Sequence, residues 1–180
     1  MKKIIILLLL ILPIAACSGS DEGAYDTNTE VPEGDPDFPS LEYSWVIDSA
    51  HVLSHDTIKY GSMVFDRLKN EGIAEVVLVT MKGISHPEDW ATHYGRWLKL
   101  GKKGLSTEGG NRGLVWLIRP DKEKKITYSA GRGLPLIGSG DFLDIMTEAK
   151  EFFNLNNFDE GVCVLIDMTD KQLRLEYRNK

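Results

Sequence analysis

The sequence predicts a single α/β domain in which a mixed sheet of about four strands is flanked by helices. Two short runs, residues 76–81 and 114–118, are apolar throughout, which is typical of strands buried on both faces. Segments with apolar residues at helical spacing alternate with these runs along the chain. The domain is expected to span residues 43–180, a length that suits one hydrophobic core.

The first half of the domain contains two predicted helices. Ser54 has the chemistry of an N-cap, and apolar residues recur at helical spacing after it until Gly72 ends the helix. A short strand is expected at residues 45–47. The second helix has capping-box spacing at Ser85 and Glu88. Its apolar stripe consists of Trp90, Ala91, Tyr94, Trp97 and Leu98.

The second half contains a predicted hairpin and two more helices. Residues 125–130 alternate apolar and polar side chains after a turn at Pro120-Asp121, so we expect an antiparallel hairpin with residues 114–118. Apolar residues at helical spacing then predict one helix through Phe142 and Phe153, and another that opens at Asn157. The second helix carries Cys163, which we assign to the core.

The first sixteen residues have the pattern of a bacterial lipoprotein signal peptide. Two lysines precede an apolar run at residues 4–12, which is shorter than the ~20 residues that a membrane span needs. The motif Ile14-Ala15-Ala16-Cys17 follows and predicts cleavage before Cys17, with lipid attached to that cysteine. We therefore expect the protein on the extracytoplasmic side of a bacterial cell membrane or outer membrane.

Residues 17–42 predict an acidic tether between the lipidated cysteine and the domain. Eight carboxylates and no lysine or arginine lie between residues 18 and 42, so this stretch has too little apolar surface to fold. As a flexible chain it would reach ~25–30 Å. The domain itself has 19 acidic and 19 basic residues, a balance that does not favour nucleic-acid binding.

Several short motifs in order along the domain resemble the TPM-domain family. They are Val46-Ile47-Asp48, the strand at residues 75–80, Trp90-Ala91 with Trp97, residues 110–118, and Ser129-Ala130-Gly131-Arg132-Gly133-Leu134. The family includes bacterial YgcG-like proteins and a thylakoid-lumen protein described as an acid phosphatase and a photosystem II repair factor. The resemblance implies a membrane-associated α/β domain, linked in some members to phosphatase activity and calcium and in others to upkeep of membrane complexes.

The sequence departs from the family pattern at two places. Asn111 and Arg112 stand where the family usually has acidic residues, and Arg132 stands where an aromatic residue is usual. The added positive charge disfavours calcium, which prefers carboxylate oxygens, and we expect no cofactor. Asp48 is the acidic position that matches, which makes it the weak candidate for a metal ligand.

The hairpin predicts an anion site at one edge of the sheet. With a turn centred near Asp121, Asn111 and Arg112 would lie opposite Ala130 and Gly131. If residues 76–81 ran parallel to residues 125–130, the start of the next helix would lie nearby, where its N-terminus favours anions. The candidate ligand-binding residues are Ser85, Arg112, Gly131, Arg132 and Gly133. The alternative is that the glycines serve a turn, Ser85 caps a helix and the arginines are solvated.

Two functions follow from these observations. The first is a binding or assembly module for membrane protein complexes, held near its partners by a lipid anchor. The alternative is an acid-phosphatase-like phosphoester hydrolase, with Asp48, Asn111 and Arg132 as candidate catalytic residues. No serine lies in a nucleophile elbow, and Cys163 lies on an apolar helix, so the sequence favours binding over catalysis.

Overall fold

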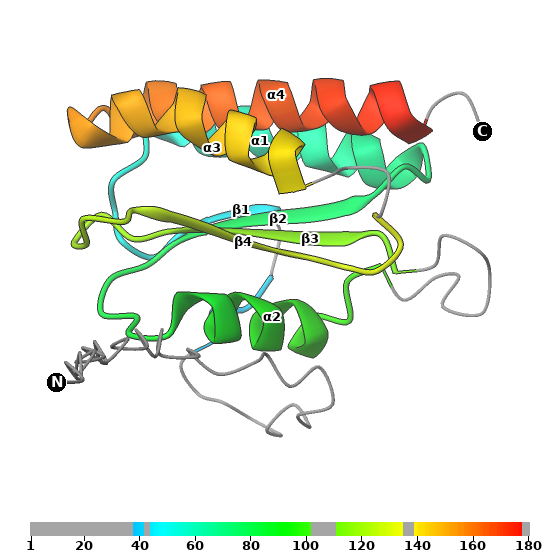
Figure 1. The fold of residues 1–180 in the computed structure, drawn as a ribbon, viewed down its shortest axis with the longest axis horizontal. Coiled ribbons are helices and arrows are strands. Elements are labelled where there is room, and N and C mark those ends of the chain that lie inside the picture. The colour runs from blue at the N-terminus through cyan, green and yellow to red at the C-terminus, as the bar shows by residue number, and fades with distance from the viewer. Residues whose placement is uncertain (1–37, 42–43, 102–110, 135–138, 178–180) are drawn as a thin grey trace, which may run out of the picture.

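The computed structural model describes residues 38–41, 44–101, 111–134 and 139–177 (Figure 1). The predicted leader at residues 1–16, including the lipobox, lies outside the described residues. The elements in chain order are β1 (Val46–Asp48), α1 (His55–Asn70), β2 (Glu75–Thr80), α2 (Pro87–Trp97), β3 (Gly113–Ile118), β4 (Ile126–Ala130), α3 (Ser139–Asn154) and α4 (Phe158–Tyr177).

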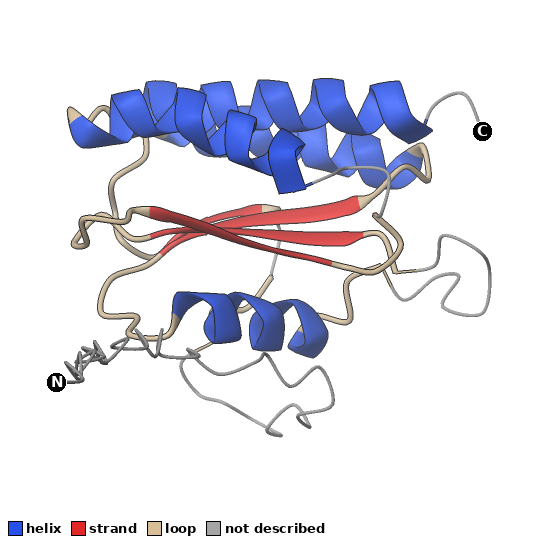
Figure 2. Ribbon diagram, in the orientation of Figure 1, coloured by secondary structure: helices blue, strands red, loops and turns tan. Residues whose placement is uncertain are grey.

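The four strands form one mixed sheet in the order β1-β2-β3-β4. The first three strands are parallel to one another, and β4 is antiparallel to β3. Helices α1, α3 and α4 cover one face of the sheet, and α2 covers the other (Figure 2). The α/β class, the mixed four-stranded sheet and the hairpin are therefore confirmed.

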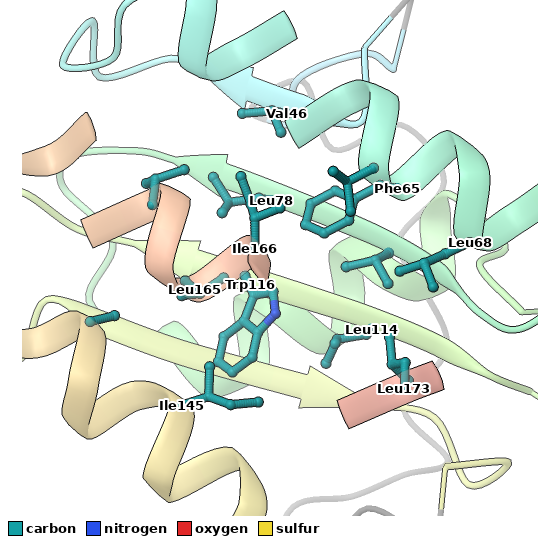
Figure 3. Packing of buried hydrophobic residues seen from close by; sticks show 14 of the residues in the cluster. Val46, Phe65, Leu68, Leu78, Leu114, Trp116, Ile145, Leu165, Ile166 and Leu173 are labelled. Atoms are coloured by element: carbon teal, nitrogen blue, oxygen red, sulfur yellow. The ribbon is translucent and has the colours of Figure 1, made fainter. Parts of the chain in front are cut away.

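The larger core lies between the sheet and the three helices α1, α3 and α4. Trp116 of β3 is fully buried there, and its indole Nε1 donates a hydrogen bond to Thr169 Oγ1 of α4 at 3.2 Å. Figure 3 shows Trp116 among apolar side chains from several elements, including Ile145 and Leu165. Strands β2 and β3 are buried on both faces, which explains why their sequences are apolar throughout.

The smaller core lies between the sheet and α2. It includes Phe38 and Leu41, which the sequence places in the tether. The Phe38 ring contacts the rings of Trp90, Tyr94 and Trp97, with centroids 5.4 to 5.7 Å away. The Tyr94 hydroxyl donates to the carbonyl of Pro39 at 2.7 Å, and burial raises its pKa. Residues 38–41 are thus part of the folded structure, although the predicted boundary is residue 43.

Two helix starts differ in how well the sequence predicts them. Ser54 caps α1, because its side chain accepts a hydrogen bond from Thr57 N–H. The predicted capping box of α2 is wrong, since the N-cap is His86 and no side chain caps the helix. The Glu88 carboxylate bonds to Lys124 Nζ at 3.0 Å instead. Cys163 lies half-buried on α4, and burial raises the pKa of its thiol.

Candidate anion site between α2 and β4

The hairpin register sets which residues meet at the carboxyl end of β4. Gly131 N–H donates to the Gly113 carbonyl at 2.8 Å, and Gly133 N–H donates to the Asn111 carbonyl at 2.9 Å. The predicted register, with Asn111 opposite Ala130, is therefore wrong. Arg119 N–H bonds to the Lys125 carbonyl, so the connection between the strands is longer than the turn at Asp121 that the sequence suggests.

A pocket of about 450 Å³ opens where α2 passes over this end of the hairpin. Its lining comes from α2, from the segment before β3, and from the end of β4. The lining residues are Thr92, Gly95, Arg96, Leu100, Asn111, Gly113, Val115, Ser129, Ala130, Gly131 and Arg132. The structure thus brings together Asn111, Gly131 and Arg132 of the predicted site.

The pocket depends on glycine at position 131. A Cβ atom on Gly131 would collide with the carbonyl and the side-chain amide of Asn111. Asn111 itself has a φ of 58°, a left-handed conformation that asparagine tolerates better than most residues. Gly131 is therefore required because two chain segments approach closely. Two residues later, the Gly133 N–H donates a hydrogen bond to the Asn111 carbonyl.

The charged groups of the pocket favour an anion. Arg96 comes from α2 and Arg132 from the turn after β4. None of the described residues that line the pocket carries a carboxylate. The carboxylate of Glu75, on the neighbouring strand β2, is used elsewhere, because it accepts a hydrogen bond from Gly101 N–H at 2.7 Å and pairs with Lys69 at 3.8 Å. Guanidinium groups next to polar amides suit a carboxylate or a phosphate.

Hydroxyl groups add hydrogen-bonding capacity along one wall of the pocket. The hydroxyls of Thr92 on α2 and Ser129 on β4 lie 2.5 Å apart and bond to each other. The sequence analysis missed Thr92, Arg96 and Ser129. A signal was present, because Thr92 and Arg96 follow Glu88 at intervals of four residues and so form one polar stripe on α2.

Two of the predicted site residues lie at the opposite end of the sheet. Strand β2 is parallel to β3, and β4 is antiparallel to β3, so the expectation that β2 and β4 run parallel is wrong. Ser85 follows the carboxyl end of β2 and therefore lies far from Arg132. Asp48 pairs with Thr80 at that same far end. Arg112 adjoins Asn111 in sequence but is not among the residues that line the pocket.

The carboxylate of Asp48 is held by hydrogen bonds from nearby chain segments. Its carboxylate accepts hydrogen bonds from the backbone N–H groups of Val52 at 3.2 Å and Leu53 at 2.9 Å. The Thr80 hydroxyl also donates to it. These bonds close the turn between β1 and α1, so the residue that the family pattern suggested as catalytic or metal-binding holds a turn.

The pocket does not fit the calcium ion that the family resemblance implies. Calcium takes six to eight oxygen ligands and usually binds several carboxylates, whereas two arginines and no carboxylate line this pocket. Over the whole described part of the chain, no group of three or more histidine, cysteine, aspartate or glutamate side chains could hold a metal ion. The described lining of the pocket therefore suits an anion better than a cation.

The fold and the family model agree on the class of this protein. The TPM domain model, TPM_phosphatase, matches residues 46–178, which is nearly the whole folded part. The chain belongs to the TPM-domain family. No curated protein is similar enough to count as a relative. Among the helices of the described residues, none is long and apolar enough to cross a membrane.

Three solved structures have the same fold. The N-terminal domain of a P. gingivalis protein is 20% identical with a TM-score of 0.64, over 75% of this chain and 85% of that chain. The N-terminal domain of the cg2496 protein from Corynebacterium glutamicum is 14% identical with a TM-score of 0.55, over 74% and 82%. The BA42 protein from Bizionia argentinensis is 18% identical with a TM-score of 0.52, over 69% and 83%. At these identities the likeness shows the fold alone.

Proposed function

We propose that this protein is a membrane-tethered, extracytoplasmic lipoprotein whose TPM domain binds membrane protein complexes during their assembly or maintenance. The observation that carries the proposal is the pocket between α2 and β4. It offers two arginines, an amide and two hydroxyls for recognition. The described residues that line it include no imidazole, carboxylate or thiol to act as a general base or a strong nucleophile. This set of groups supports binding over catalysis.

The sequence before the domain supports a role at a membrane. The lipobox at Ile14-Ala15-Ala16-Cys17 and the acidic stretch after it would hold the domain near membrane proteins. Tethering raises the effective concentration of the domain near such partners, so a modest intrinsic affinity is sufficient. Because Phe38 packs against α2, the tether joins the domain on the same side of the sheet as the pocket.

Cross-linking in cells followed by affinity purification from native membranes tests the proposal. The tagged chain is expected to recover a reproducible set of membrane proteins, identified by mass spectrometry. An Arg132→Ala variant is expected to lose them, whereas Arg67→Ala, on the exposed surface of α1, is expected to keep them. If the wild-type chain enriches no membrane protein, the binding-module proposal fails.

A phosphoester hydrolase is the second candidate. The family name includes phosphatase, and two arginines beside Asn111 suit a phosphate group. A phosphate-release assay with phosphorylated small molecules, peptides and lipids distinguishes the two functions. Turnover that Arg132→Ala abolishes without unfolding the domain would favour the hydrolase; the binding module predicts no turnover.

A further inference from the structure

Charge is distributed unevenly across the sheet, although the domain as a whole is balanced. Helices α1, α3 and α4 lie on one side of the sheet (Figure 2) and carry 11 acidic and 6 basic residues. The described residues 71–101 and 111–134, which include α2 and three of the four strands, carry 6 acidic and 9 basic residues. By sequence, residues 102–110 add two lysines and one glutamate and do not reverse this sign. The three-helix layer is therefore acidic, and the part of the chain that contains α2 is basic.

Exposed lysines flank α2 at both ends. Lys82 lies in the connection that leads from β2 into α2, and Lys99 follows the end of the helix. Both side chains are exposed, and neither ammonium group forms a hydrogen bond or an ion pair with any described residue. We call α2, together with the connections at residues 81–86 and 98–101, the α2 face. Its two free ammonium groups are available to an external anion.

Two tryptophans lie between these lysines. Trp90 and Trp97 are partly exposed, and their rings pack against Phe38 with centroids 5.5 and 5.7 Å away. On the same helix, the Glu88 carboxylate is compensated by Lys124 at 3.0 Å. Tryptophan is enriched where proteins meet lipid headgroups, because its ring is apolar and its N–H is polar. Lysines next to such rings reach anionic headgroups with their ammonium groups. The side chains of the α2 face thus suit a lipid surface.

The chain also enters the domain at the α2 face. Phe38 belongs to the smaller core beneath α2, and the Pro39 carbonyl accepts a hydrogen bond from Tyr94 at 2.7 Å. The 20 residues between Cys17 and Phe38 would reach ~25 Å as a flexible chain. The three-helix layer lies on the far side of the sheet, about 20 Å further for two packed layers. Contact between the lipid and the α2 face therefore stretches this chain less than contact with the three-helix layer.

We infer that the α2 face lies against the anionic headgroups of the bilayer that holds the lipid anchor, with the acidic three-helix layer turned away. This inference rests on the proposed lipoprotein assignment and adds the orientation of the domain. Attraction between lysine and anionic lipid acts within about 10 Å, so the difference in charge across the sheet selects the face. The carboxylates at residues 18–42 are repelled by the same lipid in either orientation. The pocket between α2 and β4 then opens beside the bilayer.

Lysine footprinting tests the inference with native side chains. The full chain is purified in detergent and reconstituted into vesicles of phosphatidylethanolamine and phosphatidylglycerol. Its lysines are then acetylated briefly with a water-soluble ester that does not cross the bilayer, and mass spectrometry measures the labelling rate of each lysine. Lys82 and Lys99 report on the α2 face. Lys150 of α3 and Lys171 of α4, which are also exposed, are the matched controls on the three-helix layer. The ratio between the two pairs cancels differences in total access.

The expected result is protection of one face that depends on lipid charge. Relative to the chain in detergent, labelling of Lys82 and Lys99 in anionic vesicles is expected to slow about threefold, the reduction that contact for two-thirds of the time produces. Lys150 and Lys171 are expected to keep their rates. High salt is expected to remove the protection, and vesicles of phosphatidylcholine alone are expected to give much less of it.

Charge-reversal variants separate contact with lipid from a change in lysine reactivity. The readout is quenching of tryptophan fluorescence by anionic vesicles that carry a nitroxide on some headgroups. The double variant Lys82→Glu with Lys99→Glu is expected to lose this quenching, whereas Lys150→Glu with Lys171→Glu is expected to keep it. All four side chains are exposed, so both variants are expected to fold, which thermal unfolding checks.

Equal slowing at the two pairs of lysines, slowing at Lys150 and Lys171 alone, or equal protection in neutral vesicles would each overturn the inference. No change at Lys82 and Lys99 on transfer from detergent to vesicles would also overturn it. The intact mass of the purified chain shows separately whether Cys17 carries lipid. A lipidated chain without a preferred face contradicts the inference alone, whereas a chain without lipid contradicts the lipoprotein proposal and the inference with it.

Discussion

At the scale of single residues, Asp48 shows how a conspicuous carboxylate can serve the fold. It accepts hydrogen bonds from the backbone N–H groups of Val52 and Leu53 and from the hydroxyl of Thr80. These three donors come from two segments that must meet before α1 can pack on the sheet. The residue therefore contributes to stability from the end of the sheet that lies away from the pocket.

Asp48→Ala is expected to lower the free energy of unfolding by about 2 to 3 kcal/mol, because it leaves half-buried donors without an acceptor. Urea unfolding measures this change. Recovery of membrane proteins by cross-linking is expected to persist, because Asp48 lies at the end of the sheet away from the pocket. A variant with unchanged stability that loses binding or turnover would contradict the structural role.

The residues proposed for the site show how much of it the sequence could predict. Asn111, Gly131 and Arg132 lie together as expected because they belong to one hairpin, whose strands are close in sequence. Ser85 was placed with them incorrectly because its position depends on the direction of β2 relative to β4, which apolar runs do not encode. Asn111 lies opposite Gly133 rather than Ala130, because the length of the connection after Arg119 depends on its backbone pairing with Lys125.

At the scale of elements, the N-terminus of α1 is joined to the N-terminal turn of α4. Asp159 of α4 accepts a hydrogen bond from Ser54 N–H at 2.8 Å, directly at the cap of α1. Burial works to raise the pKa of this carboxyl, but hydrogen bonds from Thr57 and Ser54 outweigh it and leave the pKa below its usual value. One charge thus supports the start of two helices.

Because the folded state lowers the pKa of Asp159, its contribution to stability is present above the unfolded value of about 4 and is lost as the pH falls through the folded value. Asp159→Asn is expected to cost about 1 kcal/mol at pH 7 and to cost less at acidic pH. Urea unfolding across pH measures this difference, with Asp144→Asn on the exposed surface of α3 as control. A cost that does not change with pH would contradict the account.

The aromatic contact between residues 38–41 and α2 is a second element-scale feature. Phe38 is 7% exposed and touches three aromatic rings. Phe38→Ala is expected to lower the free energy of unfolding by about 3 kcal/mol. Chemical denaturation, followed by tryptophan fluorescence, measures the change. A loss below 1 kcal/mol would show that residues 38–41 do not belong to the cooperative fold.

The sequence predicted the elements better than their ends. Apolar spacing located every helix and strand of the described chain, because burial on one stripe or on two faces leaves a direct mark on residue order. Phe38 was missed because a single aromatic residue next to Pro36, Asp37 and Pro39 carries no periodicity. The cap of α2 was misassigned because Glu88 has a distant partner, Lys124, that local spacing cannot reveal.

At the scale of the whole molecule, we propose that the chain combines a lipoprotein leader and an acidic tether with one folded domain. Cleavage of the proposed leader would remove Lys2 and Lys3 and so make the formal net charge of −6 more negative by two. The variant Cys17→Ala removes the proposed site of lipid attachment. The variant is expected to leave the detergent-extracted membrane fraction and appear among soluble extracytoplasmic proteins. Immunoblotting of fractions measures this shift. An unchanged distribution would contradict the lipoprotein assignment.

The central claim is that a tethered TPM domain engages membrane proteins through the pocket between α2 and β4. Hydrogen exchange on the full chain in native membranes, compared with the same chain purified in detergent, tests it most directly. The account predicts slower exchange in membranes at the backbone amides of pocket residues such as Ala130 and Arg132, with no change on the exposed side of α1. Identical exchange in the two preparations, or protection on α1 alone, would contradict it.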